Sequence, residues 1–233
     1  MVTAAEMATL IQARQEIVFL TGAGVSTPSG IPDYRSVDGL YTNSGVKEPA
    51  YLLSRQALLD DTADFHRFIK QLFQKEATPN VIHDKIAALE TLKKVTVITQ
   101  NIDGLHGRAG SHHLVEFHGS LARCYCETCG ENVEIDRFLH HYLHEDCGGL
   151  VRPDVVLYDE QIDSGNIERS LQAMASADTV VIVGTSFKVY PFASLIQYAK
   201  RDAQILTINK EVIETVDADA TFLGDAVAVF ELL

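Results

Sequence analysis

The chain lacks any apolar run long enough for a membrane span. Its 233 residues contain no segment near the roughly 18 apolar residues that such a span needs, and no basic N-terminal start followed by an apolar stretch. Internal repeats, low-complexity tracts and long flexible linkers are also missing from the sequence. We therefore expect a cytoplasmic globular protein with one sizeable core and room for a smaller attached module.

Basic residues are scarce relative to acidic ones. Lysine and arginine number 19 against 32 aspartate and glutamate, which gives a formal net charge of −13. This balance disfavours non-specific binding to nucleic acid or to an anionic membrane. A cationic partner, such as a lysine-rich peptide, is instead attracted.

Cysteine is also rare, and it is confined to one stretch. All four cysteines lie between residues 124 and 147, whereas secreted disulfide frameworks tend to have cysteines along the whole chain. In a cytosolic protein such clustering indicates a metal site. The residues are Cys124, Cys126, Cys129 and Cys147.

Short apolar, β-branched runs alternate with helical patterns along the chain. Each run is too short for a helix and continuous enough to be buried on both faces, which is typical of parallel strands. A helix is expected around Phe65–Phe73, and another from Thr78–Pro79 to Leu92. The pattern predicts an α/β fold with a doubly wound, Rossmann-like parallel sheet. The predicted strands are Ile17–Leu20, Val95–Thr99, Thr179–Val183 and Ile205–Ile208.

Two stretches do not fit this alternation and predict a second, smaller domain. Residues 38–75 read as helical with no strand between, and residues 120–151 hold every cysteine and many histidines. We assign these two stretches to one smaller domain with a helical part and a cysteine-rich part that could bind a metal. The large domain then consists of residues 1–37, 76–119 and 152–233.

A glycine-rich loop follows the first predicted strand. Residues 22–30 read Gly-Ala-Gly-Val-Ser-Thr-Pro-Ser-Gly, in which glycines permit close approach of the backbone to a pyrophosphate. The third glycine comes late and no acid at the end of a predicted strand follows about 20 residues on, which disfavours a hydride-transferring dehydrogenase. Tyr34 and Arg35 continue the loop and could cover a phosphate or ribose, although a proline-stiffened surface loop is the alternative.

Polar side chains follow the second strand, where open α/β sheets bind their ligands. Gln100, Asn101 and Asp103 offer amide and carboxylate groups suited to ribose hydroxyls and a carboxamide, and the alternative is a simple turn at Gly104. His118 follows a short strand-like run, Leu114–Phe117. It could be a general base near neutral pH or merely structural, and with nine histidines its position alone does not select it.

Taken together, these segments resemble the sirtuin family over nearly the whole chain. The matching segments occur in family order and spacing: Gly22–Ser26 with Gly30–Arg35, Thr99–Asp103, His118–Ser120, Arg152–Tyr158 and Gly184–Ser186, followed by the shorter Ile208–Asn209 and Gly224–Ala226. The resemblance implies an NAD-dependent protein lysine deacylase that transfers the acyl group to ADP-ribose and releases nicotinamide. The released nicotinamide is also expected to inhibit the enzyme. It implies that His118 is the catalytic base, that Asn101 orients the ribose or water, and that Asp103 acts beside them.

The resemblance also implies the binding residues. The expected NAD contacts are Ala23, Thr27, Tyr34, Arg35, Gln100, Ile102, Asp103, Gly184, Thr185, Ser186, Asn209, Asp225 and Ala226. An acyl-lysine peptide would add a strand along Val155, Val156 and Tyr158.

A structural zinc is a further implication of the resemblance. The expected ligands are Cys126, Cys129, His144 and Cys147, with histidine where the family most often has cysteine. Two alternatives are that Cys124 is the fourth ligand, or that this lineage has lost the metal.

The resemblance leaves other points open. A mono-ADP-ribosyltransferase shares the loss of nicotinamide, and an NAD-binding sensor without turnover is a second alternative. Tyr34 and Asp159 depart from common family residues near the expected acyl-lysine tunnel. Relatives that prefer acidic acyl groups carry tyrosine and arginine three positions apart, whereas Tyr51 and Arg55 are four apart, so we expect neutral acyl groups to be preferred.

Overall fold

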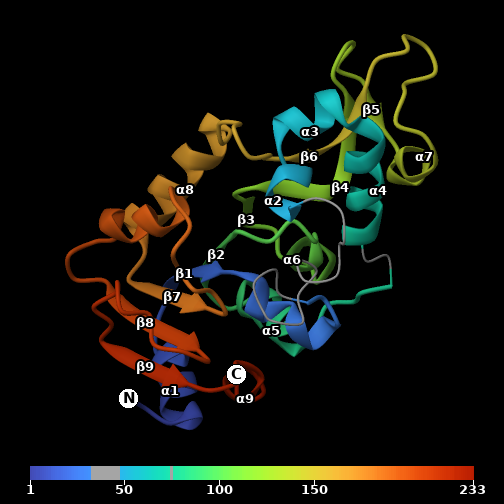
Figure 1. Ribbon diagram of the computed structural model, residues 1–233. Coiled ribbons are helices and arrows are strands. Elements are labelled where there is room, and N and C mark those ends of the chain that lie inside the picture. Colours follow the sequence, from blue (N-terminus) through green and yellow to red (C-terminus); the bar gives the residue numbers. More distant parts are fainter. Residues whose placement is uncertain (33–47, 74–75) are drawn as a thin grey trace.

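A parallel sheet forms the centre of the computed structural model, which describes residues 1–32, 48–73 and 76–233. In this part of the chain the sheet has six strands in the order β3-β2-β1-β7-β8-β9, and all neighbours run parallel (Figure 1). The order runs outward in both directions from the β1–β7 pair, as in a doubly wound sheet, so the predicted fold class is confirmed. The strands are β1 (Glu16–Thr21), β2 (Lys94–Thr99), β3 (Leu114–Glu116), β7 (Thr179–Val183), β8 (Gln204–Asn209) and β9 (Ala220–Leu223).

The side chains of β1 explain why its apolar run is continuous. Ile17 and Phe19 belong to the core on one face of the sheet, whereas Val18 and Leu20 belong to the core on the other. Successive side chains of a strand point to opposite faces, so a strand covered on both sides must be apolar throughout.

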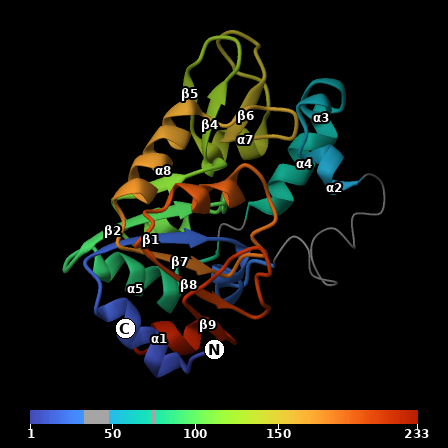
Figure 2. The same ribbon diagram turned by 90° about the vertical axis from the view of Figure 1, so that its left-hand side faces the viewer.

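Helices cover both faces of this sheet (Figure 2). One face packs against α1 (Ala4–Gln12), α5 (Val81–Leu89) and α9 (Val227–Phe230), and the other against α8 (Ser164–Ser176) and η3 (Phe192–Tyr198). The longest described helix, α8, has 13 residues. None of the described helices is long and apolar enough to cross a bilayer.

Helix α5 begins two residues after the predicted start. Asn80, and not Thr78, is its N-cap, because the Asn80 side chain accepts a hydrogen bond from the Ile82 N–H at 2.9 Å. The same side chain donates to the Val25 carbonyl at 2.9 Å and to Ser29 Oγ at 2.8 Å. The start of α5 is therefore fixed by contacts with the glycine-rich loop, which no local pattern reveals.

A second, antiparallel sheet of the described chain has the order β5-β4-β6, with β4 (Gly119–Cys126), β5 (Asn132–Val133) and β6 (Val151–Val155). It shares a separate core with four helices. This second core supports the predicted small domain, whose boundaries stay a prediction; β4 and β6 each cross one of them, and residues 38–47 and 74–75 lie outside the described residues. The helices are α2 (Pro49–Leu52), α3 (Arg55–Asp60), α4 (Thr62–Leu72) and α7 (Ile135–His140).

Asp159, in the loop after β6, has a φ of 71°, in the left-handed region that favours glycine. We expect Asp159→Gly to raise the free energy of unfolding by about 0.5 kcal/mol, since relief of backbone strain exceeds the added chain entropy. Urea unfolding measures this difference. Asp159→Ala is the matched control and should lower stability, because alanine tolerates this conformation less well. A gain with alanine and a loss with glycine would contradict the explanation.

Candidate functional site

The glycine-rich loop packs closely on the end of β7. It contains η1 (Ala23–Val25) and η2 (Thr27–Ser29), and the Gly24 N–H donates to the Gly184 carbonyl at 2.8 Å. A Cβ at Gly24 would lie 2.7 Å from Gly184 Cα, so only glycine permits this approach. The loop that holds Ala23 and Thr27 is thus placed directly against Gly184.

Thr185 connects the carboxyl ends of three strands. Its hydroxyl accepts a hydrogen bond from Gln100 Nε2 at 2.8 Å, and its carbonyl accepts one from Asn209 Nδ2 at 3.1 Å. Gln100 follows β2, Thr185 follows β7 and Asn209 ends β8. Three of the expected NAD contacts, Gln100, Thr185 and Asn209, therefore lie together, and Ser186 directly follows Thr185.

A hollow of about 490 Å³ lies between η2 and α9. Thr27 and Asp225 both line it, although they are far apart in the sequence, and Ala226 is the buried N-cap residue of α9 beside it. Lys210 and Glu231 line the same hollow and were not among the expected contacts. Lys210 could have been found, because it directly follows Asn209 at the end of β8.

Hydrogen bonds join Asn101, Ser26 and Asp103, of which Asn101 and Ser26 are buried and Asp103 is partly buried. Asn101 Nδ2 donates to the Gly22 carbonyl and to Ser26 Oγ, both at 3.1 Å, and Ser26 Oγ donates to Asp103 Oδ2 at 2.7 Å. Burial raises the pKa of the Asp103 carboxyl, opposed by hydrogen bonds from the Leu105 N–H and Ser26. Ser26 was not among the expected site residues, and only the fold reveals that it joins the other two.

Ile102 lies between these residues and the small core. Its side chain packs against that core, and its carbonyl accepts a hydrogen bond from the Leu121 N–H at 2.8 Å. The Asn101–Asp103 segment is therefore held from both sheets.

His118 lies in the turn between β3 and β4. Its Nδ1 is 3.2 Å from the Gln100 carbonyl, which can only accept, so Nδ1 has the proton and Nε2 the lone pair. Burial lowers the pKa of His118, and the hydrogen bond to Gln100 opposes this. Gly119 next to it has a φ of 79°, and a Cβ there would lie 2.0 Å from the Asp154 carbonyl. The turn that presents His118 thus requires glycine at the next position.

The expected peptide-binding segment lies beside His118. Val155 ends β6, and the Val156 N–H donates to the His118 carbonyl at 2.9 Å. Tyr158 is 55% exposed, and its N–H donates to the Leu53 carbonyl at 2.9 Å. The segment is close to the expected base, while its role in binding peptide stays a prediction. Tyr34 and Arg35 lie outside the described residues.

Four side chains of the small domain form a compact cluster that could hold a metal. The ligand atoms of Cys126, Cys129, His144 and Cys147 all lie within 4.8 Å of one another. The Sγ atom of Cys147 is 3.5 Å from that of Cys126 and 3.6 Å from that of Cys129. A tetrahedral zinc with bonds of about 2.3 Å to sulfur needs S···S distances of about 3.8 Å, so the cluster fits zinc.

Cys124 lies outside this cluster. It is 3% exposed in the small core, and burial raises the pKa of its thiol to about 12. A buried thiol that resists deprotonation is a poor zinc ligand. The geometry favours His144 over Cys124 as the fourth ligand.

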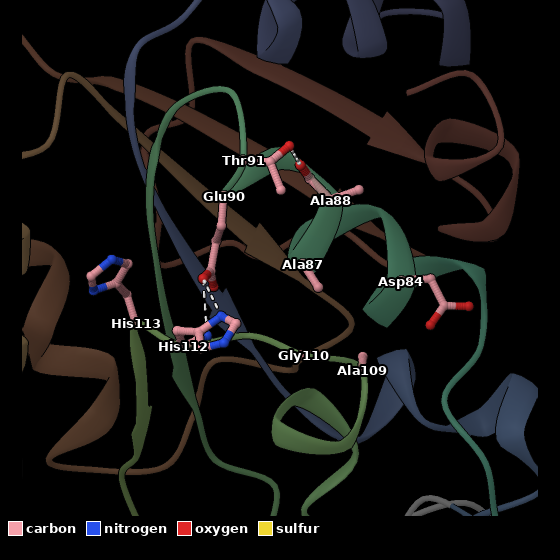
Figure 3. A pocket seen from close by; sticks show the side chains of 9 residues that line it. All are labelled: Asp84, Ala87, Ala88, Glu90, Thr91, Ala109, Gly110, His112 and His113. Atoms are coloured by element: carbon pink, nitrogen blue, oxygen red, sulfur yellow. Dashed lines mark hydrogen bonds and ion pairs between the residues drawn. The ribbon is translucent and has the colours of Figure 1, made fainter.

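A second hollow, of about 480 Å³, contains none of the expected site residues (Figure 3). It lies along α5 and the segment before β3, where His112 donates its N–H to Glu90 at 2.9 Å. This is the amino end of β3, whereas open α/β sheets bind ligands at the carboxyl ends of their strands. The expected site residues Gln100, Asn101 and His118 instead follow the carboxyl ends of β2 and β3.

Comparison with known proteins gives one consistent result. Residues 22–191 match the Sir2 family. A Listeria monocytogenes NAD-dependent protein deacetylase is 51% identical over 93% of this chain and 94% of its own length, and a Lactiplantibacillus plantarum protein of the same name is 50% identical over 99% and 97%. A Sir2 structure with deacetylated p53 peptide and 3′-O-acetyl-ADP-ribose has a TM-score of 0.88 and 29% identity, covering 99% of this chain and 97% of that one. The chain belongs to the Sir2, or sirtuin, family.

Proposed function

We propose that the chain is a cytoplasmic NAD-dependent protein lysine deacylase that consumes NAD and releases nicotinamide and O-acyl-ADP-ribose. The observation that supports this most is the hydrogen bond between His118 Nδ1 and the carbonyl of Gln100, the residue before Asn101, because it leaves Nε2 as the basic nitrogen. The Listeria and Lactiplantibacillus relatives are named NAD-dependent protein deacetylases and align over nearly their whole length.

The site residues have distinct roles in this proposal. NAD, when bound, would supply a ribose whose bond to nicotinamide breaks as the acyl oxygen of lysine attacks. His118 Nε2 would then accept a proton from a ribose hydroxyl. Asn101, held by Gly22 and Ser26, would orient the ribose or the attacking water, and Asp103 with Ile102 would receive the nicotinamide carboxamide.

The remaining contacts are assigned by position. Asp225, in the hollow between η2 and α9, would contact the adenosine side together with Thr185, Ser186 and Asn209, and Gly184 and Ala226 would lie beside them. Ala23, Thr27, Tyr34 and Arg35 would cover the pyrophosphate and the nicotinamide ribose, and Gln100 the ribose hydroxyls.

The proposed partners are an acyl-lysine peptide and nicotinamide, which acts as product and inhibitor. The peptide would add as a strand along Val155, Val156 and Tyr158, where main-chain hydrogen bonds require little sequence preference. The net charge of −13 supports binding of cationic peptide and disfavours nucleic acid and membrane as partners. Zinc would hold the small domain together without a catalytic role, since a closed set of four ligands leaves no position for water.

The contacts of Tyr51 and Arg55 support a preference for neutral acyl groups. Arg55 pairs with Glu127 and lies 3.5 Å from Glu160, and the Tyr51 hydroxyl donates to Asp61. A cation that already has two carboxylates nearby has little attraction for a third. Neither side chain is therefore positioned to bind the carboxylate of a succinyl or malonyl group.

One experiment tests both the reaction and this preference. The protein is incubated with NAD and acetyl-lysine or succinyl-lysine peptides of one sequence, and products are identified by mass. We expect nicotinamide release that requires the acyl-peptide, with kcat/KM at least about tenfold higher for acetyl-lysine.

Three results would contradict the proposal. Nicotinamide release without acyl-peptide would favour a mono-ADP-ribosyltransferase, and NAD binding without turnover would favour a sensor. A higher kcat/KM for succinyl-lysine would show that the acyl preference is wrong.

A further inference from the structure

Two buried histidines, His83 on α5 and His106 on α6 (Leu105–Arg108), have no part in the proposed reaction. They are 0% and 2% exposed, and their rings meet edge to face with centroids 4.7 Å apart. Burial lowers the pKa of both, that of His83 to about 4. Both rings are therefore neutral at neutral pH, and each has one donor and one acceptor nitrogen.

Each ring has one paired and one unpaired nitrogen. His106 Nε2 lies 3.0 Å from Thr21 Oγ1, and His83 Nδ1 accepts from the Asn80 N–H at 3.3 Å. His106 Nδ1 and His83 Nε2 are buried without a hydrogen-bond partner among the described residues. Such unpaired atoms cost free energy, which two apolar rings would avoid. The hydrogen bond to Thr21 is therefore the interaction of His106 that an apolar ring at this position could not make.

Thr21 lies where the two central strands end. Its carbonyl accepts the Gln100 N–H at 3.0 Å, and the carbonyl of Gly22 accepts Asn101 Nδ2 at 3.1 Å. The Gln100 carbonyl in turn accepts from His118 Nδ1. A shift of Thr21 would thus displace the groups that hold both Asn101 and His118.

His106 itself belongs to the segment that follows Asp103. Gly104 has a φ of 73° and starts α6, and the Leu105 N–H donates to Asp103 Oδ1 at 2.9 Å. The hydrogen bond between His106 and Thr21 therefore joins the segment of Asp103 to the end of β1. The ring of His83 packs against that of His106. His83 lies on α5, and Asn80, the N-cap of α5, also contacts the glycine-rich loop.

We propose that His106 is a positioning residue for NAD: through Thr21 it fixes the distance between Asp103 and the strand ends that hold Gln100 and Asn101. The expected change in KM rests on the proposed function, because it requires turnover. The expected change in NAD affinity rests on the fold alone. His106 itself is too buried to touch a substrate. Its loss should affect NAD far more than acyl-peptide, because the peptide segment Val155–Tyr158 continues from the end of β6, in the other sheet.

This inference can be tested with variants whose side chains do or do not place a polar atom at the position of His106 Nε2. The amide of glutamine reaches the place of the histidine Nε2, whereas the amide of asparagine reaches only that of Nδ1. We expect His106→Asn and Thr21→Val each to raise KM for NAD and its dissociation constant on the order of tenfold, with KM for peptide changed less than about twofold. His106→Gln should restore most of the wild-type value. The double variant should be no worse than either single one, because both remove one interaction.

Two controls separate positioning from loss of stability. Ile86→Val, on the buried face of α5, lowers stability without touching the hydrogen bond, and His112→Asn changes an exposed ring. Both should keep the wild-type constants for NAD. Equal shifts in Ile86→Val, no rescue by His106→Gln, or unchanged NAD constants in His106→Asn would each overturn the inference. Wild-type protein that binds NAD without turnover would contradict the proposed function instead, and the dissociation constants would still decide the role of His106.

Discussion

His118→Ala is expected to lower kcat by about 10³-fold while NAD and acyl-peptide still bind. A general base typically contributes 10²–10⁴-fold, and it acts only after both substrates are in place. The wild-type geometry supports this role, because the Gln100 carbonyl keeps the proton on Nδ1 and leaves Nε2 free to accept. Steady-state kinetics with acetyl-lysine peptide, and calorimetry for NAD, measure the two effects separately.

The pH profile of the wild type gives an independent check of His118. Burial lowers the pKa of this ring below its ordinary value of 6.5, so the neutral, basic form persists at pH values where an exposed histidine is protonated. The acid limb of kcat/KM should therefore have its midpoint below pH 6.5. His112→Ala is the control and should leave kcat unchanged, since that side chain is 86% exposed. Turnover near the wild-type rate in His118→Ala would refute the assignment.

The central sheet could be predicted because its strands are recognisable locally. The runs at Ile17–Leu20 and Thr179–Val183 are buried at every position, since helices cover both faces, and the predicted strands are confirmed. The edge strand β9 was missed because it is short and three of its four residues are only partly buried. A strand that is buried on both faces thus has a continuous apolar run in the sequence, whereas a partly exposed edge strand such as β9 does not.

Contacts between distant segments could not be predicted. Ser26 joins Asn101 to Asp103 only because the loop after β1 folds against the segment after β2. Likewise, the spacing of Tyr51 and Arg55 predicts a preference for neutral acyl groups, but only the fold reveals that Arg55 pairs with Glu127. Such pairings depend on tertiary packing, which composition and periodicity do not encode.

The fourth metal ligand is another case in which the sequence narrows the choice and the tertiary contacts decide it. The resemblance to sirtuins predicts zinc bound by Cys126, Cys129, His144 and Cys147, but it does not by itself exclude Cys124 as the fourth ligand. The fold does so by geometry: His144 Nδ1 lies 3.3 Å from the Sγ of Cys147 and 3.5 Å from that of Cys129. Cys124 instead faces the small core between β5 and β6, where it pairs with Val133 and Pro153.

The protein purified without chelator is therefore expected to contain one zinc per chain, and His144→Ala to lose most of it. Structural zinc sites in small domains bind with about 10–16 kcal/mol at neutral pH, and three cysteines leave the tetrahedron open to water and chelator. His144→Cys is the matched variant and should retain the metal with four thiolates. Cys124→Ala should retain it as well, with only the loss of stability that a core truncation causes.

Elemental analysis and thermal unfolding distinguish these variants. Loss of zinc should lower the unfolding temperature of His144→Ala far more than that of Cys124→Ala, because β4 and β6 meet at the cluster while the six-stranded sheet has its own core. Less than about half an equivalent of zinc in the wild type would refute occupancy. Full zinc in His144→Ala together with its loss in Cys124→Ala would refute the choice of ligand, since the metal would then be held by a thiol that the fold buries away from the other three.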